Sequence, residues 1–251
     1  MADNSPSVPR RVPQATRVYA IGDVHGRRDL LDQLLDAIAV DALSAPTRRV
    51  LVMLGDYIDR GDDSFGVMEQ LVQLKSGRLL GDFEIHFLMG NHEIMMLDFL
   101  ADQSNGLWLN NGGEEMLASY GLHPPFTQAQ AREHLRNAMP QSHRDVIRDL
   151  KYAHTEGDYG FVHAGIMPGV DWDAQSPDHL MWIRKEFLDS DADFGRIVVH
   201  GHSPRDEVEV RANRIGLDTR AWASGVLTCL VLEGETRRFL DTRATNQAHI
   251  T

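Results

Sequence analysis

Short apolar runs, each followed by Asp, Asn or His close to glycine, recur along this chain. Residues 50–54 are apolar, and Gly55 ends the run directly before Asp56. Such a run is typical of a strand that is buried on both faces. Similar runs at 18–21, 83–89, 159–162 and 197–199 lead to Asp23, Asn91, His163 and His202. Open α/β sheets bind ligands at the carboxyl ends of their strands, so these side chains indicate a candidate site.

Helical spacing separates the first three of these runs. Between residues 27 and 43, apolar side chains stand at 30, 31, 34, 35, 38 and 42, which predicts a helix with one buried face. A second helix is expected after Asp56, with Ser64 as its cap and its end near Gly77. The order strand–helix–strand–helix–strand predicts a parallel sheet with helices packed on it.

The pattern changes between residues 94 and 158. It predicts a helix over 94–100, an irregular loop over 107–113, a helix that a capping box at Thr127 and Gln130 begins, and another helix to about Leu150. We expect a helical insertion over the site, because the strand-end pattern resumes after it.

The last third of the chain predicts mainly strands. A hairpin turning at Gly157 is followed by a short helix over 179–188 and by short strands over 196–240, with a turn near Gly234. Consecutive strands without helices between them predict a second, largely antiparallel sheet packed against the first.

Charge and cysteine content limit the classes of partner. The 251 residues include 25 Lys and Arg against 37 Asp and Glu, a formal net charge of −12. Nucleic acid and anionic membrane surfaces require clustered basic residues, so neither is expected as the main partner. Cys229 is the single cysteine and lies in an apolar run. An intramolecular disulfide is therefore impossible, and a reducing compartment is expected.

The first residues differ in composition from the rest. Residues 1–16 are rich in Pro, Ser and Arg and lack the apolar segment of a signal peptide, which predicts a flexible N-terminal tail. A single domain is expected over 17–251, with 94–158 as its helical cap. No apolar run approaches the roughly 20 residues that cross a bilayer. We therefore expect a cytoplasmic location.

Six side chains at or beside the strand ends are candidate metal ligands: Asp23, His25, Asp56, Asn91, His163 and His202. This set of oxygen and imidazole donors, without thiolate, suits two divalent ions such as Mn, Fe or Zn. Two ions about 3.5–4 Å apart, bridged by a carboxylate and a hydroxide, form a clamp for in-line attack at phosphorus. Arg60 can hold a phosphate with its planar fork.

Five motifs give the chain a family resemblance: GDVHG at 22–26, GDYIDRG at 55–61, GNHE at 90–93, VHAG at 162–165 and GHSP at 201–204. They resemble, in type and order, those of the phosphoprotein phosphatase family of binuclear metallophosphoesterases, in its bacterial and phage form. The resemblance implies a calcineurin-like α/β fold, in which two packed mixed β-sheets are flanked by helices. It also implies two divalent metal ions, with manganese expected and iron or zinc as alternatives.

The resemblance also implies how the ligands are divided. One metal would be held by Asp23, His25 and His202 and the other by Asn91 and His163, with Asp56 bridging the two. His200, two residues before His202, is an alternative ligand, but the Gly-His-x-Pro pattern favours His202. His86 stands in the middle of an apolar run and is expected to be structural.

Four further residues receive roles by the same resemblance. His92, oriented by Asp59, would protonate the leaving alkoxide. Arg60 and Arg184 would bind the phosphate oxygens together with Asn91, and Arg184 is assigned from its Trp-Ile-Arg context. Relatives often have glycine at the position of Arg220, where this chain departs from the pattern.

The implied activity is that of a metal-dependent phosphomonoesterase, in which a metal-bridging hydroxide attacks phosphoserine or phosphothreonine in proteins. Phosphotyrosine and small phosphoesters are further candidate substrates. Hydrolysis of dinucleoside polyphosphates such as diadenosine tetraphosphate is the alternative, and the intact pair of Asp59 and Arg60 favours the first activity. A binding module without catalysis is disfavoured, because all six ligands and His92 are present.

Overall fold

The computed structural model describes residues 10–103 and 106–243, and in this part of the chain ten strands form two five-stranded sheets. The first sheet contains β1 (Thr16–Ile21), β2 (Arg48–Met53), β3 (Glu84–Phe87), β9 (Thr228–Glu233) and β10 (Thr236–Asp241), in the order β10-β9-β1-β2-β3. The strands β1, β2 and β3 are parallel, as predicted, whereas β9 is antiparallel to β1.

The second sheet is also mixed. It contains β4 (Ala153–Glu156), β5 (Tyr159–Val162), β6 (Ile197–His200), β7 (Glu209–Val210) and β8 (Arg214–Gly216), in the order β4-β5-β6-β8-β7. The predicted hairpin is β4 and β5, but β5, β6 and β8 are parallel. The prediction that the last strands form one largely antiparallel sheet is therefore wrong. Because β9 is apolar on both faces, it is buried inside the first sheet beside β1.

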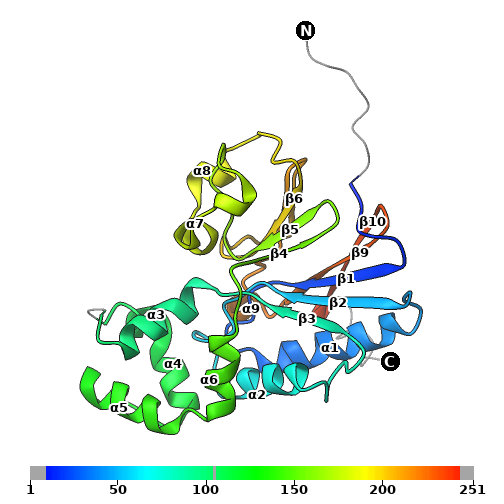
Figure 1. Ribbon diagram of the computed structural model, residues 1–251. Coiled ribbons are helices and arrows are strands. Elements are labelled where there is room, and N and C mark those ends of the chain that lie inside the picture. Colours follow the sequence, from blue (N-terminus) through cyan, green and yellow to red (C-terminus); the bar gives the residue numbers. More distant parts are fainter. Residues whose placement is uncertain (1–9, 104–105, 244–251) are drawn as a thin grey trace.

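Three apolar layers hold the sheets and helices together. The helices α1 (Arg28–Ala42) and α2 (Ser64–Lys75) cover the first sheet, and α7 (Pro177–Trp182) and α8 (Lys185–Leu188) cover the second (Figure 1). Val50 and Val52 of β2 share the layer between the sheets with Phe161, whereas Leu51 and Met53 belong to the layer under α1 and α2. The expected sandwich of two mixed sheets flanked by helices is confirmed.

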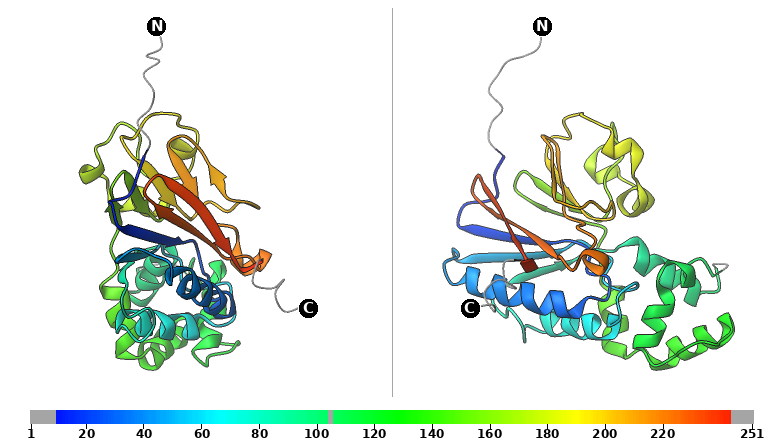
Figure 2. Two further views of the ribbon diagram at one scale, coloured as in Figure 1. Left: turned by 90° about the vertical axis from the view of Figure 1, so that its right-hand side faces the viewer. Right: turned by 180° about the vertical axis from the view of Figure 1, so that it is seen from behind.

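The helices after β3 stand to one side of the sandwich (Figures 1 and 2). They are α3 (Asn91–Leu100), α4 (Gly113–Ser119), α5 (Gln128–Ala138) and α6 (Gln141–Arg148), with a 3-10 turn at Leu109–Asn111. The predicted capping box begins α5, where Thr127 Oγ1 accepts the N–H of Gln130 at 3.2 Å. The helix α4 was not predicted, because it begins within the glycine pair at 112–113 without a side-chain cap.

Two helix predictions are wrong in detail. Ser64 does not cap α2, since the Asp63 carboxylate accepts the N–H of Gly66 at 2.8 Å in that role. Ser64 Oγ instead accepts the backbone N–H of Asp59 at 3.0 Å and supports the preceding loop. The helix expected over 179–188 is broken between α7 and α8, where Arg184 has non-helical backbone.

The first described residues pack against the sandwich. Residues 1–9 of the expected tail lie outside the described residues, as do residues 244–251 of the expected domain. Val12 is buried, and its N–H donates to the carbonyl of Gly234 at 3.1 Å, so a tail would end before this residue. Cys229 is buried in β9. Among the described residues, no helix combines the length and apolar character needed to cross a membrane.

Candidate metal centre and active site

Loops that follow five strands from both sheets meet at one edge of the sandwich. They bring together seven side chains, here called the loop cluster: Asp23, His25, Asp56, Asn91, His92, His163 and His202. Each of the seven is at most 5% exposed. The loop cluster contains all six ligands expected from the sequence, together with the expected proton donor.

The backbone of the loop cluster adopts a conformation that side chains other than glycine rarely take. Three of its residues, His25, Asp56 and His202, have φ between 45° and 72°, as do the neighbouring Asp59 and Arg60. The surrounding packing leaves little freedom, since a Cβ added to Gly55 would lie 2.6 Å from the nitrogen of Gly90. Backbone strain of this kind persists only where the surroundings impose it, and it concentrates at functional sites.

Asp56 lies at the centre of the loop cluster. Its Oδ1 atom is 3.3 Å from Nε2 of His163, and its Oδ2 atom is 3.4 Å from Nε2 of His25. Burial disfavours the charged carboxylate, but the imidazoles of His163, His92, His25 and His202 hold the pKa of Asp56 below its ordinary value. A carboxylate that turns one oxygen toward each of two histidines is suited to bridge two cations.

Backbone carbonyls fix the tautomers of two histidines. The Nδ1–H of His25 donates to the carbonyl of Ile58 at 2.9 Å, and that of His163 donates to the carbonyl of Leu54 at 2.8 Å. Each ring therefore keeps Nε2 as the ligand atom that faces Asp56. Burial lowers the pKa of His25 to about 3, so this ring is neutral and able to coordinate a metal.

The amide oxygen of Asn91 joins two more imidazoles. It is 2.9 Å from Nε2 of His163 and 2.8 Å from Nδ1 of His202. The ring of His202 therefore lies with Asn91 and His163, and the expected grouping of His202 with Asp23 and His25 is wrong. His202 contacts the Asp23 carboxylate through its backbone N–H, at 2.9 Å, and not through its ring. The left-handed backbone at His202 turns the ring away from Asp23.

The loop cluster offers two overlapping groups of ligand atoms. His25, Asp56 and His92 place ligand atoms within 4.8 Å of one another, and Asp56 does the same with His163 and His202. Buried carboxylate and imidazole donors without thiolate are those that borderline divalent ions prefer. The arrangement fits two ions that share Asp56.

Unbalanced negative charge beside Asp56 supports this fit. Burial and repulsion by Asp218 and Asp56 raise the pKa of Asp23 well above its ordinary value. Burial, with Asp56 nearby, also raises the pKa of Asp218 to about 6. Buried like charges are unfavourable unless cations compensate them. Asp218 was not predicted as a site residue.

His92 is held against Asp59. Its Nδ1–H donates to Oδ2 of Asp59 at 2.7 Å, and the indole N–H of Trp108 donates to the same oxygen at 2.9 Å. Burial opposes protonation, but the charges of Asp56 and Asp59 outweigh it and raise the pKa of His92. The Nε2 atom of His92 faces the centre, 3.9 Å from Oδ2 of Asp56. Trp108 was not predicted as a site residue.

Two arginines, Arg60 and Arg184, point into the loop cluster. The guanidinium of Arg60 donates to Nε2 of His25 at 2.9 Å, and its other terminal nitrogen lies 3.0 Å from Nε2 of His92. The Nε–H of Arg184 donates to Nε2 of His202 at 3.0 Å. Both guanidinium groups therefore lie beside the candidate ligands, where an anion that binds the centre would meet them.

Glu93 organises the loop after β2, a role that the sequence did not reveal. Its carboxylate accepts the backbone N–H groups of Asp56 at 2.9 Å, Tyr57 at 2.8 Å and Gly90 at 3.0 Å. Burial, with Asp56 nearby, raises the pKa of Glu93 to about 8. Glu93 thus fixes two of the ligand loops relative to each other. Its place in the motif at 90–93 was the only signal.

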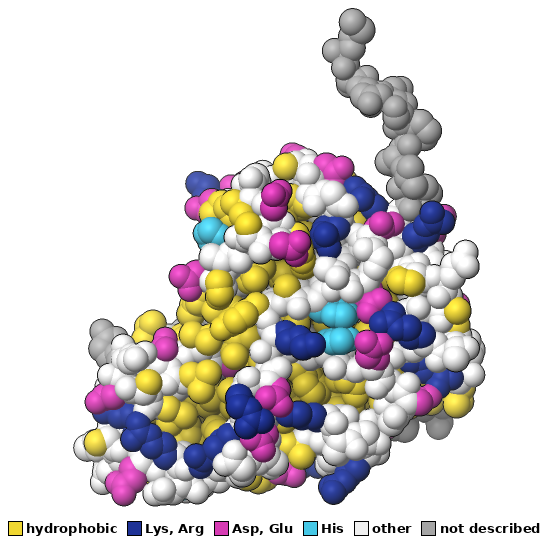
Figure 3. All heavy atoms as spheres, in the orientation of Figure 1, with side chains coloured by type: hydrophobic (Ala, Val, Ile, Leu, Met, Phe, Trp, Pro, Cys, Tyr) yellow, Lys and Arg dark blue, Asp and Glu magenta, His cyan; other side chains and the backbone are white. Residues whose placement is uncertain are grey.

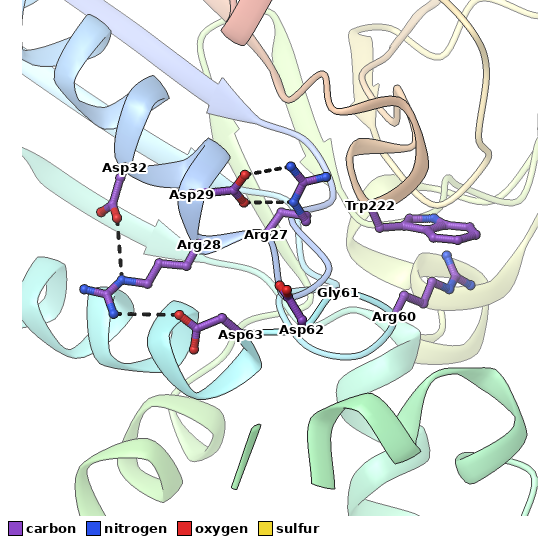
Figure 4. Close-up of a pocket in the computed structure, with 9 residues that line it drawn as sticks. All are labelled: Arg27, Arg28, Asp29, Asp32, Arg60, Gly61, Asp62, Asp63 and Trp222. Atoms are coloured by element: carbon purple, nitrogen blue, oxygen red, sulfur yellow. Dashed lines mark hydrogen bonds and ion pairs between the residues drawn. The ribbon is translucent and has the colours of Figure 1, made fainter. Parts of the chain in front are cut away.

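A cavity of about 820 Å³ opens beside Arg60 (Figure 4). The indole ring of Trp222 forms one wall, and its centroid is 5.6 Å from the Arg60 guanidinium. The other side chains that line it are charged: Arg27, Arg28, Asp29, Asp32, Asp62 and Asp63. Ion pairs join Arg27 to Asp29 and Arg28 to both Asp32 and Asp63. The cavity extends the site toward solvent.

The structure places His200 outside the loop cluster. Its Nδ1–H donates to the carbonyl of Gly201 at 3.0 Å, and its ring meets that of Phe187 edge-on at 5.1 Å. His200 therefore packs at the end of β6 against Phe187.

Known proteins resemble this chain over most of its length. It is 29% identical over 218 residues to serine/threonine-protein phosphatase 1 of Salmonella typhimurium, an alignment that covers 84% of this chain and 89% of that protein. It is 27% identical over 166 residues to the symmetrical bis(5'-nucleosyl)-tetraphosphatase of Acidovorax sp., covering 63% of this chain and 46% of that protein.

A solved structure with the same fold and a matching family model agree with these sequence similarities. The cold-active protein-tyrosine phosphatase of a psychrophilic Shewanella species has the same fold, with a TM-score of 0.59 and 18% identity over 92% of this chain and 83% of that one. The family of calcineurin-like phosphoesterases matches residues 16–224. The chain therefore belongs to the calcineurin-like phosphoesterase family.

Proposed function

We propose that this metallophosphoesterase removes phosphate from phosphoserine and phosphothreonine in proteins, with two divalent ions, manganese first among them, in the loop cluster. Phosphotyrosine is a further substrate of the same kind. Relatives named serine/threonine-protein phosphatase 1 and 2 support the proposal, since they align with 84% of this chain and with 89–90% of their own length. A cytoplasmic location stays a prediction.

The pairing of His92 with Asp59 carries the proposal. A serine alkoxide is a poor leaving group, so its departure from phosphorus needs a proton donor in the transition state. His92 has one nitrogen fixed by Asp59 at 2.7 Å, and its other nitrogen faces the centre. The raised pKa of His92 favours the protonated ring that such a donor requires.

The proposed centre assigns the metal ions to six residues of the loop cluster. Asp23 and His25 would hold one ion, Asn91, His163 and His202 the other, and Asp56 both. When bound, two divalent ions polarise the phosphate and lower the pKa of water enough to supply a nucleophile at neutral pH.

The chain's own side chains perform the other tasks. Arg60 and Arg184 would bind phosphate oxygens, and their charge would stabilise the negative transition state. His92 would give the proton on Nε2 to the departing oxygen, while Asp59 stabilises the imidazolium and fixes its tautomer.

One observation favours hydrolysis of a dinucleoside polyphosphate as the alternative. Trp222 offers an aromatic face beside Arg60, on which a base could stack. The charges of the cavity argue against it, because four carboxylates accompany Arg27, Arg28 and Arg60 in the lining. The named tetraphosphatase of Acidovorax also aligns with only 46% of its own length. A protein substrate is therefore the better supported.

A substrate panel tests the proposal. Protein reconstituted with Mn²⁺ should release phosphate from phosphoserine and phosphothreonine peptides with a higher kcat/KM than it shows on diadenosine tetraphosphate. Chelation should abolish both activities, and Asp56→Asn serves as the matched inactive control. A higher kcat/KM on diadenosine tetraphosphate would contradict the proposal, as would full turnover in protein shown by elemental analysis to be free of metal. Turnover of neither substrate, with both metals bound, would indicate a binding module.

A further inference from the structure

An apolar groove lies in the helical insertion and is separate from the loop cluster. This cap groove, of about 440 Å³, is lined by Met89 and by side chains of α3, α5 and α6. Seven of the lining side chains are apolar, and the other three are arginines: Arg136, Arg144 and Arg148. Figure 3 shows apolar surface over these helices, with basic side chains beside it.

The apolar lining of the cap groove is suited to adaptable contacts. The volume is within the range of about 300–1,000 Å³ that is usual for ligand pockets. Three of the lining side chains are Met89, Met96 and Met139, and flexible thioether side chains adjust to the shape of a partner. Leu97 also lines the groove and is 36% exposed. Covering such apolar surface is favourable, so the lining predicts an occupant that contributes apolar side chains.

Two arginines of the cap groove have no acidic partner. Within residues 10–103 and 106–243, no carboxylate forms an ion pair with Arg136 or Arg144. The guanidinium of Arg136 donates to the carbonyl of Leu100, and that of Arg144 donates to the carbonyl of Met139 at 2.9 and 3.1 Å. These bonds hold the two groups beside the groove and use only part of their N–H donors. Carbonyls at helix ends carry partial charges only, so they do not neutralise a guanidinium.

The third arginine is partly neutralised. Arg148 pairs with Asp145 at 2.5 Å and with Asp149 at 3.0 Å, and Lys75 also pairs with Asp149 at 2.5 Å. These two carboxylates therefore face four cations, which are the three arginines and Lys75. An excess of two positive charges remains beside the groove, although the whole chain has a net charge of −12.

The arginines are spread over the groove, and this spread favours an occupant with several carboxylates. Arg144 and Arg148 stand one helical turn apart on α6, about 6 Å along its axis, and Arg136 belongs to α5. None of the lining side chains is acidic, since Asp98 of α3 and Glu133 of α5 lie outside the lining. An amphipathic helix presents carboxylates at i and i+4 with the same spacing as the arginines of α6. A fatty acid offers one carboxylate only.

We propose that the cap groove binds an acidic amphipathic segment of a partner protein. The apolar side chains of the segment enter the groove, and its carboxylates pair with Arg136 and Arg144. An amphipathic helix laid into an apolar groove is a recurring mode of peptide recognition, and the basic surroundings would reject a basic segment. The proposal does not depend on the activity of the loop cluster.

Peptide binding to the full-length protein tests this surface. The probe is a fluorescein-labelled peptide of leucine and glutamate, about 12 residues long, whose leucines have the i, i+3, i+4 and i+7 spacing of an amphipathic helix. Fluorescence anisotropy gives its Kd. Arg144→Glu should raise the Kd at least about tenfold, which is the worth of one charge-assisted hydrogen bond. Leu97→Ser should raise it about fivefold through the loss of apolar contact.

Matched controls lie outside the cap groove. Arg78→Glu changes another exposed arginine, and Leu43→Ser changes a leucine that is 84% exposed at the end of α1. Both controls should keep the wild-type Kd. Circular dichroism checks that each variant is folded, and two groove variants are used so that the misfolding of one leaves the other as the test.

Two further probes distinguish the possible occupants. A peptide with lysine in place of glutamate should bind at least about tenfold more weakly than the acidic peptide. Dodecanoate serves as the fatty acid. The proposal would be overturned by tighter binding of the lysine peptide, or by binding of dodecanoate without binding of the acidic peptide. A folded groove variant with the wild-type Kd, or an equal rise in Kd in the controls, would overturn it too. Binding is measured without turnover, so a failure of the proposed activity would leave this test intact.

Discussion

The loop cluster and the junction cluster use the same kinds of side chain on different kinds of backbone. Three of the seven residues of the loop cluster, His25, Asp56 and His202, have left-handed backbone, whereas the four side chains of the junction cluster, which are Glu84, His86, His154 and Glu156, stand on regular strands. Strand geometry sets the junction rings in a parallel stack, 3.7 Å apart. The loops instead direct their donors from several sides toward one carboxylate. In this chain, donors that converge on one carboxylate stand partly on strained loops, whereas parallel stacking arises on regular strands.

The position of arginine also differs between the two clusters. Arg48 pairs directly with the carboxylates of the junction cluster, which are therefore partly neutralised. Beside the loop cluster, Arg60 and Arg184 donate to the imidazoles of His25 and His202 and leave the Asp56 carboxylate for the proposed cations. Removal of a carboxylate should therefore impair turnover in the loop cluster and stability in the junction cluster.

The largest effect is expected from Asp56→Asn. In the proposed centre Asp56 serves both ions, and metal ions supply several kcal/mol of transition-state stabilisation, so turnover should fall by about 10³-fold or more. Phosphopeptide turnover and elemental analysis provide the measurement. Normal turnover with two metals per chain would show that Asp56 does not bridge. Glu156→Gln is the matched control and should keep wild-type turnover.

Arg60→Ala and Arg184→Ala should weaken phosphate binding. Each removes charge-assisted hydrogen bonds worth about 1.5–3 kcal/mol, which corresponds to about 10- to 100-fold in the inhibition constant of inorganic phosphate. Arg48→Ala at the junction cluster is the control and should leave this constant unchanged. An unchanged constant for either site variant would remove that arginine from the phosphate-binding site.

A smaller effect is expected from Trp108→Phe. The substitution deletes the 2.9 Å hydrogen bond to Asp59 but keeps most of the buried volume. Asp59 would then hold His92 less firmly, and turnover of phosphoserine peptides should fall by about tenfold, which is the worth of one hydrogen bond to a charged group. A loss of stability with unchanged kcat would show that Trp108 serves packing alone.

The smallest effect is expected at the junction cluster. The pKa of Glu156 is lowered from 4.5 to about 2, so its ionised form stabilises the fold above pH 4.5, and this stability is lost as the pH falls toward 2. Glu156→Gln should reduce the free energy of unfolding by about 1 kcal/mol at neutral pH, because the ion pair is partly solvent-screened. The difference from wild type should shrink in acid. A constant difference from pH 7 to pH 3, measured by chemical denaturation, would contradict this account.

Features that depend on local sequence, such as the parallel strands and the polar residues that follow them, were predictable. The alternation of apolar runs and helices predicted the parallel core of the first sheet, and residues such as Asp56 and Asn91 were found because they directly follow strands. The sheet that β9 joins was not predictable, because strand partners far apart in sequence are chosen by burial in the folded molecule.

Features that depend on tertiary geometry escaped prediction. The side on which the His202 ring lies follows from its left-handed backbone, which the sequence does not encode in an obvious pattern. Trp108 and Glu93 act on the site through hydrogen bonds across the fold, and no spacing rule links them to Asp59 or Tyr57. The stacking of His86 on His154 arises only where the two sheets adjoin.

The central claim is that His92 donates a proton and is not a metal ligand, although its Nε2 lies 3.9 Å from the shared carboxylate. The most direct test compares His92→Ala with wild type on a phosphoserine peptide and on nitrophenyl phosphate, whose leaving group needs no proton. The variant should keep both metals, lose about 10²–10⁴-fold on the peptide and lose less on the nitrophenyl ester. Equal losses on the two substrates with both metals retained, or the loss of a metal, would contradict the account.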